Sequence, residues 1–216
     1  MSSLLLLLLD SRSPAGGHNH SGGMEPAIGS GMVRDLADVE EYCRGRLRTS
    51  GRVAAAFAAV AFSLWPGEPA GWAELDAEFD ARAPSEAVRA ASRQLGSGLR
   101  RLLRATVPQA DLTTPWAALP SPAPHHPLVL GAGVALAGGT PELAARAAAL
   151  GAVSVPASAA VRLLGLDPFA VHALLARLAP SIDECAATSG LPADSAPALD
   201  LLADFHLTTE VRLFAS

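Results

Sequence analysis

Lysine is absent from the 216-residue sequence, and all sixteen basic residues are arginine. A P-loop nucleotidase needs a lysine to reach the phosphates of its nucleotide, and a Schiff-base enzyme needs a lysine amine, so both classes are excluded. Aromatic residues make up only 5% of the chain, whereas 50% of it is hydrophobic and rich in alanine and leucine. These two residues favour helices, so the composition predicts an all-α protein with one well-buried domain.

Positive charge and cysteine are also scarce. The formal net charge is −5, which does not suit the neutralisation of nucleic-acid phosphates. Cys43 and Cys185 lie too far apart for a CxxC motif, so we expect two free thiols in a reducing compartment. The apolar run Leu4–Leu9 is too short to span a bilayer. We therefore expect a cytoplasmic protein with no nucleic-acid or membrane partner.

Helix-start signals and the spacing of apolar residues predict one helical-bundle-like domain over residues 1–216, with about eight to ten helices. No run alternates clearly between apolar and polar residues. Proline blocks helix interiors, so residues 140–150 and 156–164 are expected to form two separate helices. Two segments are expected as loops, a glycine-rich one at 14–31 and a proline-rich one at 107–127.

Four arginines fall on one face of the helix that should begin after Pro84. Leucines with a 3.6-residue period occupy a different face of the same helix. The basic face is either a solvated flank or a binding stripe for an acidic protein partner. The four residues are Arg89, Arg93, Arg100 and Arg104.

Two histidines stand two residues apart in the glycine-rich segment, at His18 and His20. Imidazole is a common ligand of Ni²⁺ and Zn²⁺, and Glu25 is the nearest plausible third ligand. The alternative is that both histidines make hydrogen bonds that shape the loop. From these residues alone an interaction module is favoured over an enzyme, because no nucleophile motif such as G-x-S-x-G occurs.

The segment from Asp10 to Glu25 reads D-S-R-S-P-A-G-G-H-N-H-S-G-G-M-E. It resembles the N-terminal signature of the UreF family of urease accessory proteins, P-x-G-G followed by a short aromatic and serine stretch and then S-x-G-L-E. His18 and His20 replace residues that are often aromatic in the family, and Met24 replaces its leucine. The matching residues are Pro14, Gly16, Gly17, Ser21, Gly23 and Glu25.

Three later segments resemble the family in the same order. They are Arg93 to Gly96 (R-Q-L-G), the stretch from His126-Pro127 to residues 159–163 (A-A-V-R-L), and the ending R-L-F-A-S at residues 212–216, which is similar to R-L-F-x-S. The resemblance covers essentially the whole chain. It departs from the family at residues 165–168, where G-L-D-P replaces P-L-G-Q.

The resemblance implies an all-α, non-enzymatic chaperone for nickel insertion. Members dimerise, bind the scaffold UreD (also called UreH) and recruit the GTPase UreG, and the assembly delivers Ni²⁺ to apo-urease. Nickel would then be cargo of the complex rather than a firmly bound cofactor. The runner-up interpretation is a stand-alone metal-binding helical enzyme that uses His18, His20 and Glu25.

The expected partner-binding residues lie in the two end segments. The apolar tail residues suggest docking of the chain end, and the resemblance adds a role for Arg212 in shaping the surface that UreG recognises. The full set is Pro14, Gly16, Gly17, His18, His20, Ser21, Gly23, Glu25, Arg212, Leu213 and Phe214.

Overall fold

The computed structural model describes residues 2–10, 20–119, 123–207 and 214. In these residues the secondary structure is entirely helical, which confirms the all-α prediction. The helices are α1 (Ser3–Leu9), α2 (Met24–Gly29), α3 (Leu36–Arg48), α4 (Ser50–Leu64), α5 (Pro69–Ala81), α6 (Glu86–Thr106), the 3-10 helix η2 (Thr114–Trp116), α7 (His126–Leu136), α8 (Pro141–Leu164), α9 (Pro168–Arg177), α10 (Ala179–Ala186) and α11 (Pro197–Leu207).

Side-chain caps start several of these helices where the sequence indicates. The Asp35 carboxylate, the Ser85 and Thr140 hydroxyls and the Asp167 carboxylate each accept a backbone N–H from the first turn of the following helix. Such caps satisfy donors that have no partner inside the helix. The described residues contain eleven α-helices, more than the expected eight to ten, because the short helices α1, α2 and α10 were not expected.

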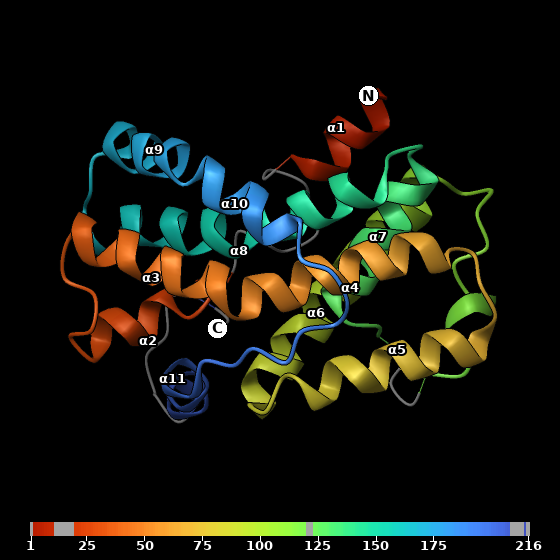
Figure 1. Ribbon diagram of the computed structural model, residues 1–216, viewed down its shortest axis with the longest axis horizontal. Coiled ribbons are helices and arrows are strands. Elements are labelled where there is room, and N and C mark those ends of the chain that lie inside the picture. The colour runs from red at the N-terminus through yellow and green to blue at the C-terminus, as the bar shows by residue number, and fades with distance from the viewer. Residues whose placement is uncertain (1, 11–19, 120–122, 208–213, 215–216) are drawn as a thin grey trace.

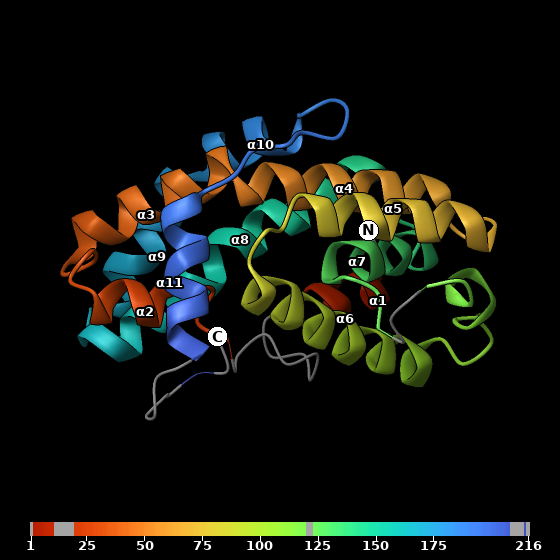
Figure 2. The same cartoon turned by 90° about the horizontal axis from the view of Figure 1, so that it is seen from below.

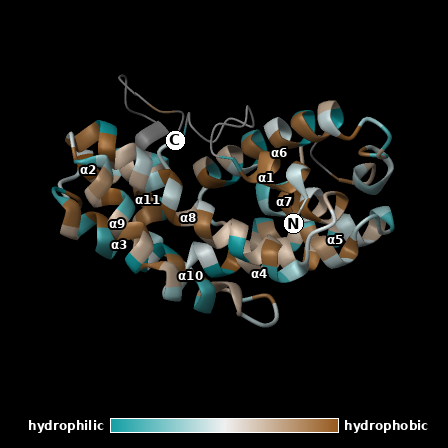
Figure 3. Cartoon of the chain, turned by 90° about the horizontal axis from the view of Figure 1, so that it is seen from above, coloured by the Kyte–Doolittle hydropathy of each residue, from teal (hydrophilic) through white to brown (hydrophobic). Residues whose placement is uncertain are grey.

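Helices α4 and α8 pack against each other, and both contribute side chains to two hydrophobic cores. Helices α5, α6 and α7 surround one core, and helices α2, α3 and α9 surround the other, at opposite ends of Figure 2. Hydrophobic and hydrophilic residues both occur along the length of α6 (Figure 3), and its buried residues include Leu99 and Leu103. Helix α11 lies against α2 and α6, near the visible C-terminal end (Figure 1).

Helix α8 corrects one expectation, because residues 141–164 form a single helix that contains Pro156. Proline removes the N–H that would bond the carbonyl four residues earlier. That carbonyl belongs to Ala152, and it accepts a hydrogen bond from the Nε of Arg46 at 2.8 Å. Replacement of the lost bond from outside the helix explains why α8 continues. Helix α8 is also apolar and long enough to cross a membrane, but it packs against α3, α4 and α10.

The two segments expected as loops contain helical turns. Helix α2 occupies residues 24–29 of the glycine-rich segment, and η2 together with the first residues of α7 occupies part of the proline-rich segment. Both cysteines are free and buried, as expected. Burial raises the pKa of the Cys43 thiol and of the Cys185 thiol to about 11, so both are protonated near neutral pH.

Candidate partner-binding site at the chain ends

A tight turn at Gly22 and Gly23 leads into α2. Both glycines have positive φ angles, +59° and +81°, a region that glycine occupies without steric cost. A Cβ atom on Gly23 would lie 2.6 Å from the Oη of Tyr42. The Met24 N–H closes the turn on the Ser21 carbonyl at 3.2 Å. The signature glycines therefore allow the chain to pass closely over α3.

The two end segments singled out in the sequence meet at Glu25 and Phe214, which are 189 positions apart. The backbone N–H of Phe214 donates to the Oε2 of Glu25 at 3.0 Å. The Phe214 ring is buried, and the guanidinium carbon of Arg162 lies 4.4 Å from its centroid. Cation–π contact and burial thus hold Phe214 against Glu25 of α2 and Arg162 of α8. Partner binding by the end segments stays a prediction.

His20 and Ser21 are buried, with His20 only 4% exposed. The charge of His20 acts on His126 at the start of α7, and burial together with this charge lowers the pKa of His126 to about 4. His126 is therefore neutral near pH 7. His18, the other half of the predicted histidine pair, lies outside the described residues, as do Pro14, Gly16, Gly17, Arg212 and Leu213.

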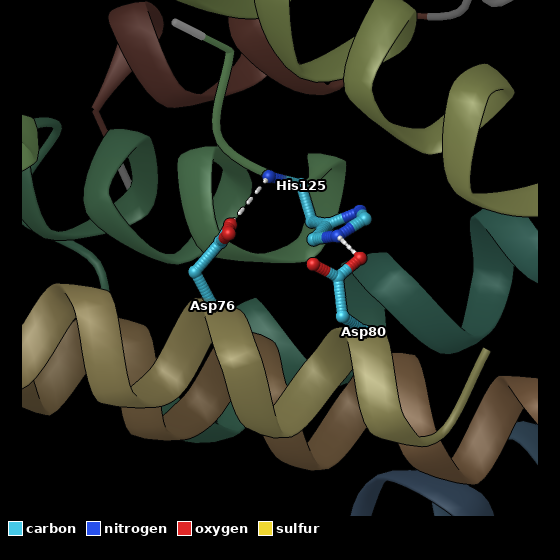
Figure 4. A group of neighbouring side chains, drawn as sticks. All are labelled: Asp76, Asp80 and His125. Atoms are coloured by element: carbon cyan, nitrogen blue, oxygen red, sulfur yellow. Dashed lines mark hydrogen bonds and ion pairs between the residues drawn. The ribbon is translucent and has the colours of Figure 1, made fainter. Parts of the chain in front are cut away.

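A second polar cluster, which the sequence reasoning missed, joins α5 to the segment before α7 (Figure 4). The Nε2 of His125 lies 2.8 Å from the Oδ1 of Asp80, and the His125 backbone N–H donates to the Oδ1 of Asp76 at 3.4 Å. Arg93 of α6 bridges the carboxylates of Asp76 and Asp80, at 2.9 and 2.7 Å. Asp76 and His125 have no exposed side-chain surface.

By residue type this cluster could hold a metal ion, because ligand atoms of Asp76, Asp80 and His125 lie within 4.8 Å of one another. Arg93, however, already supplies the positive charge between the two carboxylates. Burial raises the pKa of Asp80, but the hydrogen bonds and charges of His125 and Arg93 outweigh this and hold it below its usual value. Burial also lowers the pKa of His125. We interpret the cluster as an ion-pair network that ties three elements together.

Two residues of the motif R-Q-L-G at 93–96 help to join α6 to the segment before α7. Arg93 is the cation of the network and also donates to the Ala123 carbonyl at 2.9 Å. A Cβ atom on Gly96 would lie 2.0 Å from the Pro124 carbonyl oxygen. Glycine at this position is what lets the segment before α7 lie directly on α6.

The arginines of α6 do not form a free basic stripe. Arg89 donates to the carbonyls of Ala83 and Pro84. Arg100 donates to the Leu112 carbonyl at 3.1 Å, and its guanidinium carbon lies 5.3 Å from the Trp116 ring centroid. Arg93 is committed to the network described above. These three charges are used inside the fold, so the hypothesis of a docking stripe for an acidic partner is not supported.

The sequence did carry a weak signal for the missed cluster. Asp76 and Asp80 stand four residues apart, which places them on one face of a helix. Two adjacent histidines follow in the proline-rich segment. Spacing alone could not show that Arg93 and His125 come from other elements to meet them.

Comparison with known proteins agrees with the resemblance. The UreF family model matches residues 33–179. The urease accessory protein UreF of Mycolicibacterium vanbaalenii is 47% identical over 222 residues and covers 100% of both chains. The UreF of Mycobacterium sp. strain JLS is 46% identical over 98% of this chain and 97% of its own length. That of Mycobacterium tuberculosis strain H37Rv is 41% identical over 99% of this chain and 98% of its own length.

These relatives are named as accessory proteins and not as enzymes, which confirms the non-enzymatic prediction over the stand-alone enzyme. The chain therefore belongs to the UreF family of urease accessory proteins.

Proposed function

We propose that this protein bridges the UreD (UreH) scaffold and the UreG GTPase, and that the assembly delivers Ni²⁺ to apo-urease. The observation that carries the proposal is the junction of Glu25 with Phe214. It joins one residue from each of the two segments that most resemble the UreF family. A surface built from both ends of the chain is suited to recognition by a partner protein.

The wider setting is part of the same proposal. The protein works in the cytoplasm, as a homodimer within the complex, and contacts apo-urease through that complex. Nickel is cargo that passes through the assembly, and GTP hydrolysis belongs to UreG, since this chain has no lysine to build a P-loop.

Co-expression provides the direct test. Apo-urease, UreD and UreG are expressed with and without this chain, and urease activity and co-purification are measured. We expect activity and a UreD-containing complex only when the chain is present. Equal activity without the chain, or failure to co-purify with UreD, would contradict the proposal.

Two finer roles can be tested in the same system. His18 and His20 either handle nickel or shape the N-terminal segment, and the double change His18→Ala/His20→Ala at limiting nickel separates these roles. A nickel role predicts lost activation that excess nickel restores. Loss that nickel does not restore would assign a shaping role, and the single change His20→Gln controls for the burial of His20.

Arg212 is proposed to shape the surface that UreG recognises. Arg212→Ala should weaken recruitment of UreG while UreD binding stays near the wild-type level. A sharp fall in melting temperature, or unchanged UreG recruitment, would show that this arginine only docks the chain end.

A further inference from the structure

The backbone hydrogen bond that Pro156 removes from α8 is replaced by a hydrogen bond from one residue of α3. Proline has no N–H, so the carbonyl of Ala152 loses its helical partner. The Nε of Arg46 donates to this carbonyl at 2.8 Å. A buried carbonyl without a partner is unfavourable, so α8 depends on α3 at this turn.

The same guanidinium also holds the N-terminal segment. Its Nη1 donates to the Gly22 carbonyl at 2.9 Å, and the Tyr42 hydroxyl donates to the same oxygen at 2.8 Å. A Cβ atom on Gly22 would lie 3.2 Å from the Cδ of Pro156. Helix α3, the proline turn of α8 and the turn before α2 therefore meet at one point.

The charge of Arg46 extends this junction towards the other end of the chain. Burial raises the pKa of Tyr42, and the charge of Arg46 together with its hydrogen bond opposes that effect. Burial and the nearby Asp204 raise the pKa of Asp200 on α11, and Arg46 again opposes them. Helix α11 itself packs against α2, the helix that follows the Gly22 turn.

We propose that Arg46 is a positioning residue for the surface formed by residues 21–25 and Phe214. Its hydrogen bond to the Ala152 carbonyl fixes the guanidinium on α8, and its hydrogen bond to the Gly22 carbonyl then positions the turn before α2. The planar fork of a guanidinium can donate to two carbonyls at a fixed separation, which a lysine ammonium cannot do in the same way. The inference rests on the proposed function, because this surface is the one offered to the scaffold.

Hydrogen exchange tests the positioning without any partner. Arg46→Met should speed exchange of the Met24 and Ala27 amides, which bond to Ser21 and Gly23, by about tenfold, the factor that corresponds to 1.4 kcal/mol. Arg44→Met is the matched control, because Arg44 lies on the same helix and pairs only with Glu40 among the contacts seen here. Unchanged exchange in Arg46→Met would overturn the proposal.

The change Pro156→Ala separates support of α8 from placement of the turn. Alanine at 156 supplies the N–H that the Ala152 carbonyl lacks, so the double variant Arg46→Met/Pro156→Ala should regain much of the melting temperature lost in Arg46→Met. Binding of UreD, measured against the single Pro156→Ala variant, should stay weaker by about tenfold. Recovery of both properties would show that Arg46 only fills the gap in the helix and would overturn the proposal.

The two tests also distinguish failure of this inference from failure of the proposed function. If the wild-type chain does not bind UreD, the proposed function is wrong, whereas the exchange rates still decide whether Arg46 positions the turn. If the wild type binds and Arg46→Lys binds equally well with unchanged exchange, the positioning role is wrong and the proposed function stands.

Discussion

The two hydrophobic cores of this protein contain different kinds of side chain. The core around α5, α6 and α7 contains the cluster of Trp65, Trp72 and Trp116, whose ring centroids lie 5.7–6.1 Å apart, next to the Asp76–Arg93 network. The core around α2, α3 and α8 relies on small side chains of α8, among them Ala145, Ala149, Ala157 and Ala160.

The two cores also differ in the regions of the chain that their hydrogen-bonding residues contact. In the first core, Arg93 and Arg100 bond to groups of the same region. In the second, the buried aromatic residues of the described chain are Tyr42 and Phe214, and both contact the end segments. The first core is therefore a closed scaffold, whereas the second carries the candidate site. Substitutions in the first should change stability, and substitutions in the second should change partner binding.

The strongest test of this contrast is removal of a buried charge from the first core. Asp76→Ala leaves Arg93 with one carboxylate instead of two, and breaking a buried pair costs about 3–5 kcal/mol. Unfolding in urea measures the loss. Asp183→Ala is the control, because the Arg146–Asp183 pair is more than half exposed on both sides and should contribute below about 1 kcal/mol. A loss below about 1 kcal/mol in Asp76→Ala would contradict the scaffold interpretation.

Removal of the Phe214 ring should act on the second core. Burial of a phenylalanine side chain is worth about 1.5–3 kcal/mol, and the Arg162 contact is lost with it. Phe214→Ala should therefore release the chain end, which faster proteolysis there and weaker UreD binding would report. Phe169→Ala is the stability control, since Phe169 is 86% exposed. Equal proteolysis of the two variants would be inconsistent with docking at Phe214.

Two glycine-to-alanine changes in helices should have opposite signs. Gly96→Ala places a Cβ against the Pro124 carbonyl, and overpacking of this kind costs about 1–3 kcal/mol. Gly45→Ala meets nothing within 4 Å and should stabilise α3 by roughly 0.5–1 kcal/mol. Thermal unfolding of both variants measures the difference. Stabilisation by Gly96→Ala would show that the contact with the proline-rich segment is loose.

Acid should destabilise the protein through His126, at the start of α7, by a smaller amount. The pKa of His126 is about 4 in the folded chain and about 6.5 when unfolded, so only the unfolded chain takes up this proton between these values. Stability should then fall by about 1.4 kcal/mol per pH unit below pH 6.5. The lowered pKa of His125 acts in the same direction, whereas that of Asp80 matters only below about pH 4.

Urea unfolding at pH 7 and pH 5.5 measures this dependence. His126→Asn should flatten it, because asparagine does not titrate. A slope that remains unchanged in His126→Asn would assign the effect to other groups.

Local sequence rules predicted most helix boundaries but not the contacts between them. Thr140 caps a helix where one was expected to begin, because capping depends on neighbouring residues alone. The prediction of two helices on either side of Pro156 was wrong, since the group that replaces the missing hydrogen bond lies 110 residues earlier, at Arg46. A local rule cannot include a donor from another helix.

The candidate site was predictable only where family-like motifs marked it. Those motifs pointed to Glu25 and Phe214, and the structure joins them, although neither position predicts the other. Arg93 was assigned to a surface stripe because helical periodicity shows which residues share a face, but not whether another segment covers that face. The segment before α7 covers it, and Gly96 is the reason it can.

The contact between Glu25 and Phe214 has a consequence for the order of synthesis. Helices α1 to α10 can pack as they emerge, since domains fold from the N-terminus during translation, but this contact needs a residue near position 214. A chain cut short before that residue would keep the first core, lose the Phe214 ring from the second and lack the joined surface. A partner that binds this surface would therefore bind only copies in which translation had passed position 214, and it would leave shorter copies out of the assembly.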